Sequence, residues 1–199
     1  MSYRDFVFPG VERTLGLTLG NESLFPNVVP VVPHPEMVRR LEHGIRVGQG
    51  IGTEKARSEF IIAPVILEIL ALLQDRYSVF SGIEFNVDAA RGLSGYCDFL
   101  IARSPLMYAL RAPVVAVAEA KRDDVLTGLG QCVAAMRAAW LFNQAEGVVL
   151  EQVYGVSTTG LDWKFLRLRD TDLTIDLDSY SITDPGRVMG ALIHMATTA

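Results

Sequence analysis

Two acidic residues and a lysine occur in apolar segments of the sequence, where a charged side chain needs a chemical reason. The apolar run Val114–Ala118 leads directly into Glu119, Ala120 and Lys121, and Asp98 lies in a second short apolar segment. Side chains alternate between the faces of a β-strand, so Glu119 and Lys121 are expected on the same face. A buried charge is costly unless it is paired or bound to a metal ion. Two carboxylates on neighbouring strands, followed by this lysine, can hold a divalent metal ion and act on a phosphodiester.

Two further polar residues lie on the helices expected before and after these strands. Gln131 belongs to the predicted helix Asp124–Ala145, on a face of small residues that can approach a sheet closely. Glu59 belongs to the predicted helix Thr53–Gln74 and lies near one stripe with the apolar residues Ile62, Ile66, Ile69 and Leu73. Two interpretations of Glu59 stay open: a partly exposed residue at the helix edge, or a carboxylate that points at the site.

Several short segments, apolar or β-branched and bounded by Gly, Asp, Ser or Pro, are typical of strands. They are Tyr77–Val87, Tyr96–Arg103, Pro113–Ala120, Val148–Ser157, Trp163–Arg169 and, as a further candidate, Leu173–Tyr180.

Additional helices are expected at Glu36–Ile45 and Arg187–Thr197. The four glycines of Gly44–Gly52 favour a turn or a flexible loop. Pro64 is expected to kink the helix that contains it, or to divide that helix in two.

The predicted order of elements is a helix, three strands, a helix, two or three strands and a final helix. Three strands in a meander, followed by a crossover helix and more strands, give an α/β fold with a mixed sheet and helices on both faces. The length of 199 residues favours a single structural domain. Within it, residues 1–52 are expected to form an arm that packs on the core or on a neighbouring subunit, and residues 53–199 the main body.

Taken together, the polar residues resemble the motif of the PD-(D/E)XK nuclease superfamily. Its elements stand here as Glu59, Gly95-x-x-Asp98, Glu119-x-Lys121 and Gln131, although Cys97 occupies the position of the motif's proline. The resemblance covers about residues 59–169 and implies a restriction-endonuclease-like αβββαβ core.

The resemblance also implies a role for each residue. Asp98 and Glu119 would bind Mg²⁺ or Mn²⁺, with the backbone carbonyl of Ala120 as a third candidate ligand. Lys121 would orient or help to deprotonate the attacking water and offset charge on the scissile phosphate. Gln131 would organise the site. Glu59 would bind a second metal ion or hold a water molecule.

The function implied is that of a metal-dependent nuclease that hydrolyses DNA phosphodiester bonds, in a fold that frequently works as a homodimer. One alternative is an inactive member, a nucleic-acid-binding or assembly module in which Asp98, Glu119 and Lys121 form a buried ion-pair network. Another is an unrelated α/β enzyme in which Glu-x-Lys is a coincidence. DNA versus RNA, strandedness and sequence specificity stay open.

Composition constrains these alternatives only loosely. The net charge of −5 argues against a general nucleic-acid coat protein. Two cysteines form no disulfide framework or zinc spacing, and no signal peptide or membrane span is expected, so we expect a cytoplasmic protein. Positive charge is most concentrated before and within the first long helix, and again on a late strand. These residues line a nucleic-acid groove or form an ordinary surface: Arg39, Arg40, Arg46, Lys55 and Arg57, and Lys164, Arg167 and Arg169.

Overall fold

The computed structural model describes residues 1–74 and 76–199, and within these residues eight strands form one mixed sheet. The strands are β1 (Thr18–Glu22), β2 (Ser78–Glu84), β3 (Tyr96–Ala102), β4 (Val114–Ala120), β5 (Val153–Thr158), β6 (Asp162–Arg169), β7 (Asp172–Asp176) and β8 (Tyr180–Ser181). Their order across the sheet is β1-β7-β6-β5-β4-β3-β2, and β8 pairs with β6.

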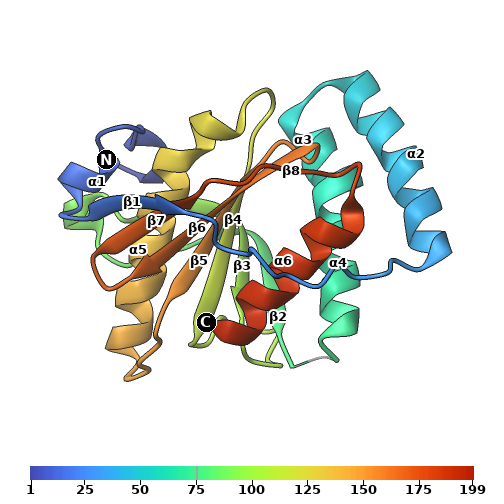
Figure 1. Ribbon diagram of the computed structural model, residues 1–199. Helices are drawn as coiled ribbons and strands as arrows, with labels where there is room; N and C mark the ends of the chain where they lie inside the picture. The colour runs from blue at the N-terminus through green and yellow to red at the C-terminus, as the bar shows by residue number, and fades with distance from the viewer. Residues whose placement is uncertain (75) are drawn as a thin grey trace.

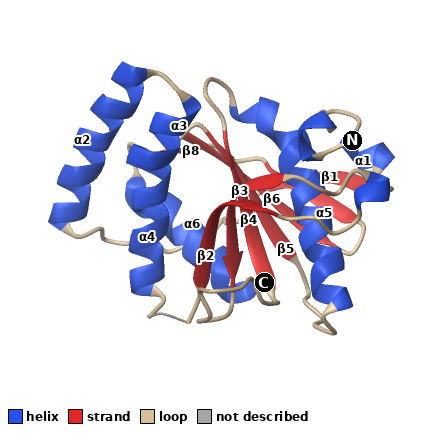
Figure 2. Cartoon of the chain, turned by 180° about the vertical axis from the view of Figure 1, so that it is seen from behind, coloured by secondary structure: helices blue, strands red, loops and turns tan. Residues whose placement is uncertain are grey.

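Helices cover both faces of this sheet (Figures 1 and 2). They are α1 (Val11–Thr14), α2 (Pro35–Ile51), α3 (Glu54–Arg57), α4 (Ala63–Leu72), α5 (Leu129–Ala145) and α6 (Pro185–Thr198). Helix α5 packs on one face, while α4 and α6 lie on the other and α2 packs outside α3 and α4. The expected α/β class, a central mixed sheet flanked by helices, is therefore confirmed.

The central connections follow the predicted order. Strands β2, β3 and β4 form an antiparallel meander, and α5 then leads into β5, which pairs parallel to β4. Strand β4 is buried along its whole length because it lies inside the sheet with helices on both faces. The carboxyl ends of β4 and β5 therefore lie at the same edge of the sheet, where Ala120 is paired with Thr158.

The helix expected at Thr53–Gln74 is present from Glu54 to Leu72 as three contiguous segments: α3, a π-helical turn at Ser58–Ile62, and α4. Thr53 caps α3, because its hydroxyl accepts a hydrogen bond from the Ala56 amide at 3.1 Å. The backbone stays helical at both junctions, so Pro64 does not divide the helix. Proline lacks the N–H that would donate to the preceding turn, and it lies directly after the π-helical turn, where the hydrogen-bond pattern changes.

The glycine-rich segment Gly44–Gly52 was expected to form a turn or loop, and that expectation is wrong. The preceding helix continues as α2 to Ile51. A Cβ atom at Gly44 would lie 2.0 Å from the Phe60 carbonyl oxygen, and one at Gly48 would lie 3.1 Å from the Ile61 side chain. These glycines serve close helix packing, a use that local turn signals do not distinguish from flexibility.

The first 34 residues pass over both faces of the sheet. Tyr3 is fully buried and its hydroxyl donates to the Phe85 carbonyl at 2.6 Å, next to α5. Strand β1, which the sequence did not predict, then adds to the edge of the sheet in parallel with β7. The chain next crosses α6. Cβ atoms at Gly186 and Gly190 of that helix would each lie 2.4 Å from a backbone carbonyl oxygen of the crossing segment.

Length and apolar character alone would allow the helical run Val125–Ala145 to cross a membrane. Most of that run is buried inside this fold, against the sheet. The same composition therefore has a structural explanation as a core helix.

Candidate functional site

Asp98 lies at the point where the pairing of β3 with β4 ends. The last paired residues are Phe99 and Ala118. Beyond them, the Asp98 side chain takes the place of a backbone acceptor, since its Oδ2 accepts a hydrogen bond from the Ala120 amide at 2.8 Å. This carboxylate is thereby held beside the residue that follows Glu119.

Glu119 is fully buried near the end of β4. One carboxyl oxygen, Oε2, accepts a hydrogen bond from the Gln131 Nε2 at 2.6 Å. The other, Oε1, is buried without a hydrogen-bond partner among the described residues. An unpartnered buried oxygen is rare and costly, so it needs an explanation in the chemistry of the site.

The surroundings raise the pKa of Glu119 well above its ordinary value of 4.5. Burial is the largest cause, because it disfavours the charged form, and the Asp98 carboxylate is the next. The positive charge of Lys121 opposes the shift. Burial and the neighbouring acid therefore both favour the protonated form of Glu119.

Lys121 is held by the helix that follows. Its ammonium group donates to Gln131 Oε1 at 3.2 Å, so Gln131 bridges Glu119 and Lys121 with its two amide atoms. In the described part of the chain Lys121 forms no ion pair with either carboxylate, so the buried ion-pair network of the inactive-member alternative is not observed.

Gly128 allows this arrangement. It precedes α5 in a 3-10 turn, Val125–Gly128, that packs over the end of β5. A Cβ atom there would lie 2.3 Å from the Ser157 hydroxyl and 2.9 Å from the Lys121 Cγ. The close approach brings Gln131, three residues later, within reach of both charged residues. Sequence spacing alone did not single out Gly128.

A cleft of about 250 Å³ opens beside these carboxylates. Asp98 and Ala120 form one wall, Ser81 and Gly82 of β2 another, and the α3 region supplies Glu54, Lys55, Ser58 and Glu59. Asp98 is thus accessible from the side of α3, whereas Glu119 is fully buried and does not line the cleft.

Glu59 lines this cleft but is half exposed and forms an ion pair with Lys55 at 2.8 Å. Glu54 was not expected at the site, yet its negative charge contributes to the raised pKa of Glu119. The stripe that favoured Glu59 assumes 3.6 residues per turn, and the π-helical turn beginning at Ser58 breaks that period.

The predicted concentration of positive charge does not gather at the cleft. Arg39 and Arg40 both pair with Glu36 on α2, and Lys55 pairs with Glu59. Among the late-strand residues, Arg167 of β6 pairs with Glu22 of β1, and neither residue lines the cleft. The structure brings together Asp98, Glu119, Ala120, Lys121 and Gln131, and leaves most of the cationic residues elsewhere.

The described residues contain no group of three His, Cys, Asp or Glu side chains close enough to hold a metal ion. The set that the resemblance implied, Asp98, Glu119 and the Ala120 carbonyl, has only two such side chains. The unpartnered Glu119 Oε1 beside a second carboxylate fits such an ion, because hard cations take oxygen ligands and complete their shell with water.

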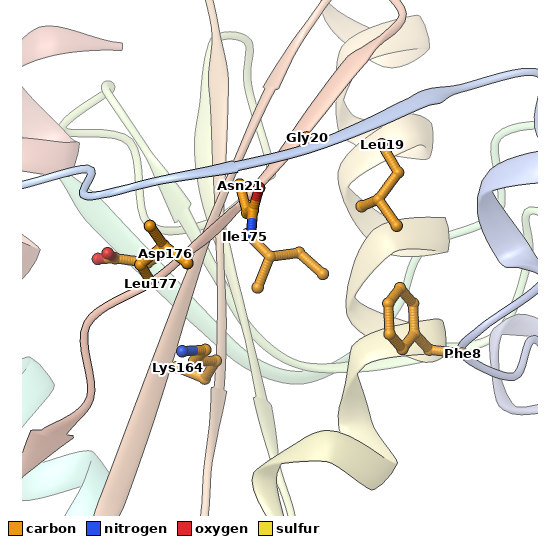
Figure 3. A pocket seen from close by; sticks show the side chains of 8 residues that line it. All are labelled: Phe8, Leu19, Gly20, Asn21, Lys164, Ile175, Asp176 and Leu177. Carbon is orange, nitrogen blue, oxygen red and sulfur yellow. The ribbon is translucent and has the colours of Figure 1, made fainter.

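A second hollow, of about 470 Å³, is lined by residues of the neighbouring strands β1, β7 and β6 and by Phe8 (Figure 3). Its walls are mostly apolar, from Phe8, Leu19, Ile175 and Leu177. The Lys164 ammonium donates to the Asp178 carbonyl at 3.0 Å, and it points away from Phe8 and Leu19, as does the Asp176 carboxylate. No facing pair of reactive groups is aimed into this hollow within the described residues.

No family model, curated protein or solved structure matches this chain. The chemistry of the site consequently rests on the residues and geometry described above.

Proposed function

We propose that this chain is a metal-dependent nuclease of the PD-(D/E)XK type, hydrolysing DNA phosphodiester bonds with Mg²⁺ or Mn²⁺. The observation that carries the proposal is the fully buried carboxyl group of Glu119 beside the partly buried one of Asp98, with one Glu119 oxygen unpartnered among the described residues and a lysine held two residues further on. Burying an acid beside a second one costs stability, and a divalent cation would offset that cost.

The residues of the chain would divide the work as follows. Bound Mg²⁺ or Mn²⁺ would offset the negative charge that develops on the scissile phosphate. Gln131 accepts one N–H of the Lys121 ammonium and leaves the other two free to contact a phosphate oxygen or the attacking water. The amide of Gln131 also fixes the Glu119 carboxyl group, so both residues are oriented before substrate arrives.

Metal binding can be tested before any substrate is known, by calorimetric titration with Mn²⁺. Asp98→Asn keeps an acceptor for the Ala120 amide but removes the charge, and it should abolish binding. Because the pKa of Glu119 is raised, binding to the wild type should release protons, which two buffers of different ionisation enthalpy would reveal. Lys121→Met should bind Mn²⁺ as wild type does, and so should the matched control Glu151→Gln, an exposed residue beyond the other end of the sheet.

The alternative function, a catalytically inactive nucleic-acid-binding or assembly module, predicts a different outcome. In that case the wild type would show no Mn²⁺ binding, even with a DNA duplex or single strand present. That result would exclude the nuclease proposal.

A further inference from the structure

An open groove runs between α2 and the α4 segment, on the outside of the molecule. Helix α2 touches the π-helical turn before α4 at Gly44 and Gly48, and it leans away from α4 towards its own N-terminal end (Figures 1 and 2). Two adjoining hollows of about 460 and 670 Å³ occupy the space between them and share Glu36, Arg40 and Pro64.

The groove combines an apolar surface with exposed hydrophobic side chains on one rim. Met37 and Pro64 line it, and Phe60, Leu67 and Leu72 of the α4 side are 40%, 63% and 46% exposed. Leu67 and Leu72 belong to a helix whose other face is buried in the core. Clustered exposure of large apolar residues marks an interaction surface.

The two rims carry opposite charge. On α2, the single carboxylate of Glu36 serves both Arg39 and Arg40, whose side chains stay about three-quarters exposed, so this rim keeps a net positive charge. On α4, Glu68 lines the groove and forms no ion pair within the described part of the chain. The exposed apolar side chains of α4, Leu67 and Leu72, form a ridge beside the groove, which we call the α4 ridge. Glu68 gives this ridge a negative charge, opposite to the charge of the α2 rim.

We propose that this groove is the contact surface of a homodimer, in which the α4 ridge of each copy enters the groove of the other. In a two-fold contact each surface meets itself, so Glu68 of each copy would face Arg40 of its partner on both sides of the axis. Insertion would bury Leu67 and Leu72 and neutralise the charges of both rims. This inference does not depend on the proposed nuclease activity.

A single strand of nucleic acid is the competing occupant, with Phe60 as a stacking platform and the arginines as phosphate contacts. The groove disfavours it, because Glu36, Glu59 and Glu68 line the same path. A phosphate backbone would meet three carboxylates there, whereas a second copy of this chain brings the complementary charge to each rim.

Charge reversal tests the two-fold contact directly, by light scattering on size-exclusion chromatography at about 100 μM chain. Wild type should have twice the mass of the 21.8 kDa chain. Arg40→Glu alone and Glu68→Arg alone should each be monomeric, because like charges face each other at both halves of the contact. An equimolar mixture of the two variants should restore the dimer, since every contact then pairs opposite charges.

Further variants separate a specific contact from loss of folding. Leu67→Glu should be monomeric with an unchanged circular dichroism spectrum, and Tyr108→Glu, at a 99% exposed residue of the β3–β4 loop, should stay dimeric. A monomeric wild type, or a mixture of charge variants that stays monomeric, would overturn the proposal. So would binding of a single-stranded oligonucleotide to monomeric wild type that Arg40→Glu abolishes, which would assign the groove to nucleic acid.

Discussion

Glu119 on β4 and Asp176 on β7 are both buried acids at the same edge of the sheet, yet their surroundings differ in kind. Each side chain is at most 1% exposed, and each has one carboxyl oxygen without a hydrogen-bond partner among the described residues. Burial is the largest cause of a raised pKa in both. Burial and a raised pKa therefore do not by themselves distinguish a reactive site from a structural one.

The partners make the distinction. Asp176 Oδ1 accepts two backbone N–H groups, from Leu24 at 3.2 Å and Asp178 at 3.0 Å, so it fastens two chain segments together. Glu119 accepts only the side-chain amide of Gln131 and faces the Asp98 carboxyl group. A buried acid bonded to backbone holds the fold, whereas one that meets a second acid and a held lysine fits the metal site that we propose.

The largest expected effect concerns cleavage. Glu119→Gln keeps the size and an acceptor for Gln131 but cannot bind a cation as a carboxylate does. Metal-dependent cleavage of DNA should fall by about 10³-fold, the order expected when one preorganised electrostatic group is lost. The rate is measured with a saturating divalent metal, and the thermal transition should be no lower than that of wild type. A variant that cleaves at the wild-type rate would show that Glu119 is not part of the reaction.

A smaller effect, on stability alone, is expected at Asp176. Asp176→Ala removes the acceptor of two backbone N–H groups and should lower the free energy of unfolding by about 1–3 kcal/mol. Asp176→Asn retains an amide oxygen and should lose less. Urea denaturation measures both, and Mn²⁺ binding should be unchanged in each variant. Loss of Mn²⁺ binding in a folded Asp176→Asn would place this acid in the metal site and remove the contrast with Glu119.

The smallest effect is the pH dependence of stability due to Glu119. Its folded-state pKa is raised, so the folded chain keeps a proton that the unfolded chain releases above about pH 4.5. Relative to Glu119→Gln, wild type should be equally stable below that pH and should lose stability as the pH rises towards the folded-state pKa. Urea denaturation from pH 4 to 8 measures the difference between the two proteins, and saturating Mn²⁺ should oppose the wild-type loss of stability, because only the wild type binds the ion. A constant difference across this range would mean that the Glu119 pKa is not raised.

The sequence pattern was sufficient to predict much of the local structure around the site. The run Val114–Ala118 before Glu119 predicted a buried strand, and Gln131 was correctly expected on a following helix that approaches the sheet. These predictions succeed because a buried strand and a helix with a face of small residues are determined by side chains close together in the sequence. Asp98 and Glu119 were then expected to lie close together, because their strands were predicted to be neighbours.

Other features depend on residues far apart in the chain. Strand β1 is exposed along its length and has no alternating pattern, so it exists only because β7 offers a free edge. The helical glycines Gly44 and Gly48 are explained by the backbone and side chains of residues 60 and 61 rather than by local turn preference. The phase of the helix around Glu59 depends on a π-helical turn that no local period reveals.

The sequence by itself therefore determined which residue types could carry the chemistry and on which kinds of element they lie. Only the tertiary structure decided their electrostatic state. The raised pKa of Glu119 comes from burial and from the Asp98 carboxyl group, and the position of Lys121 comes from Gln131 on a separate helix. Burial and contacts between separate elements arise only when the chain folds, so their effects on a pKa cannot be read from spacing along it.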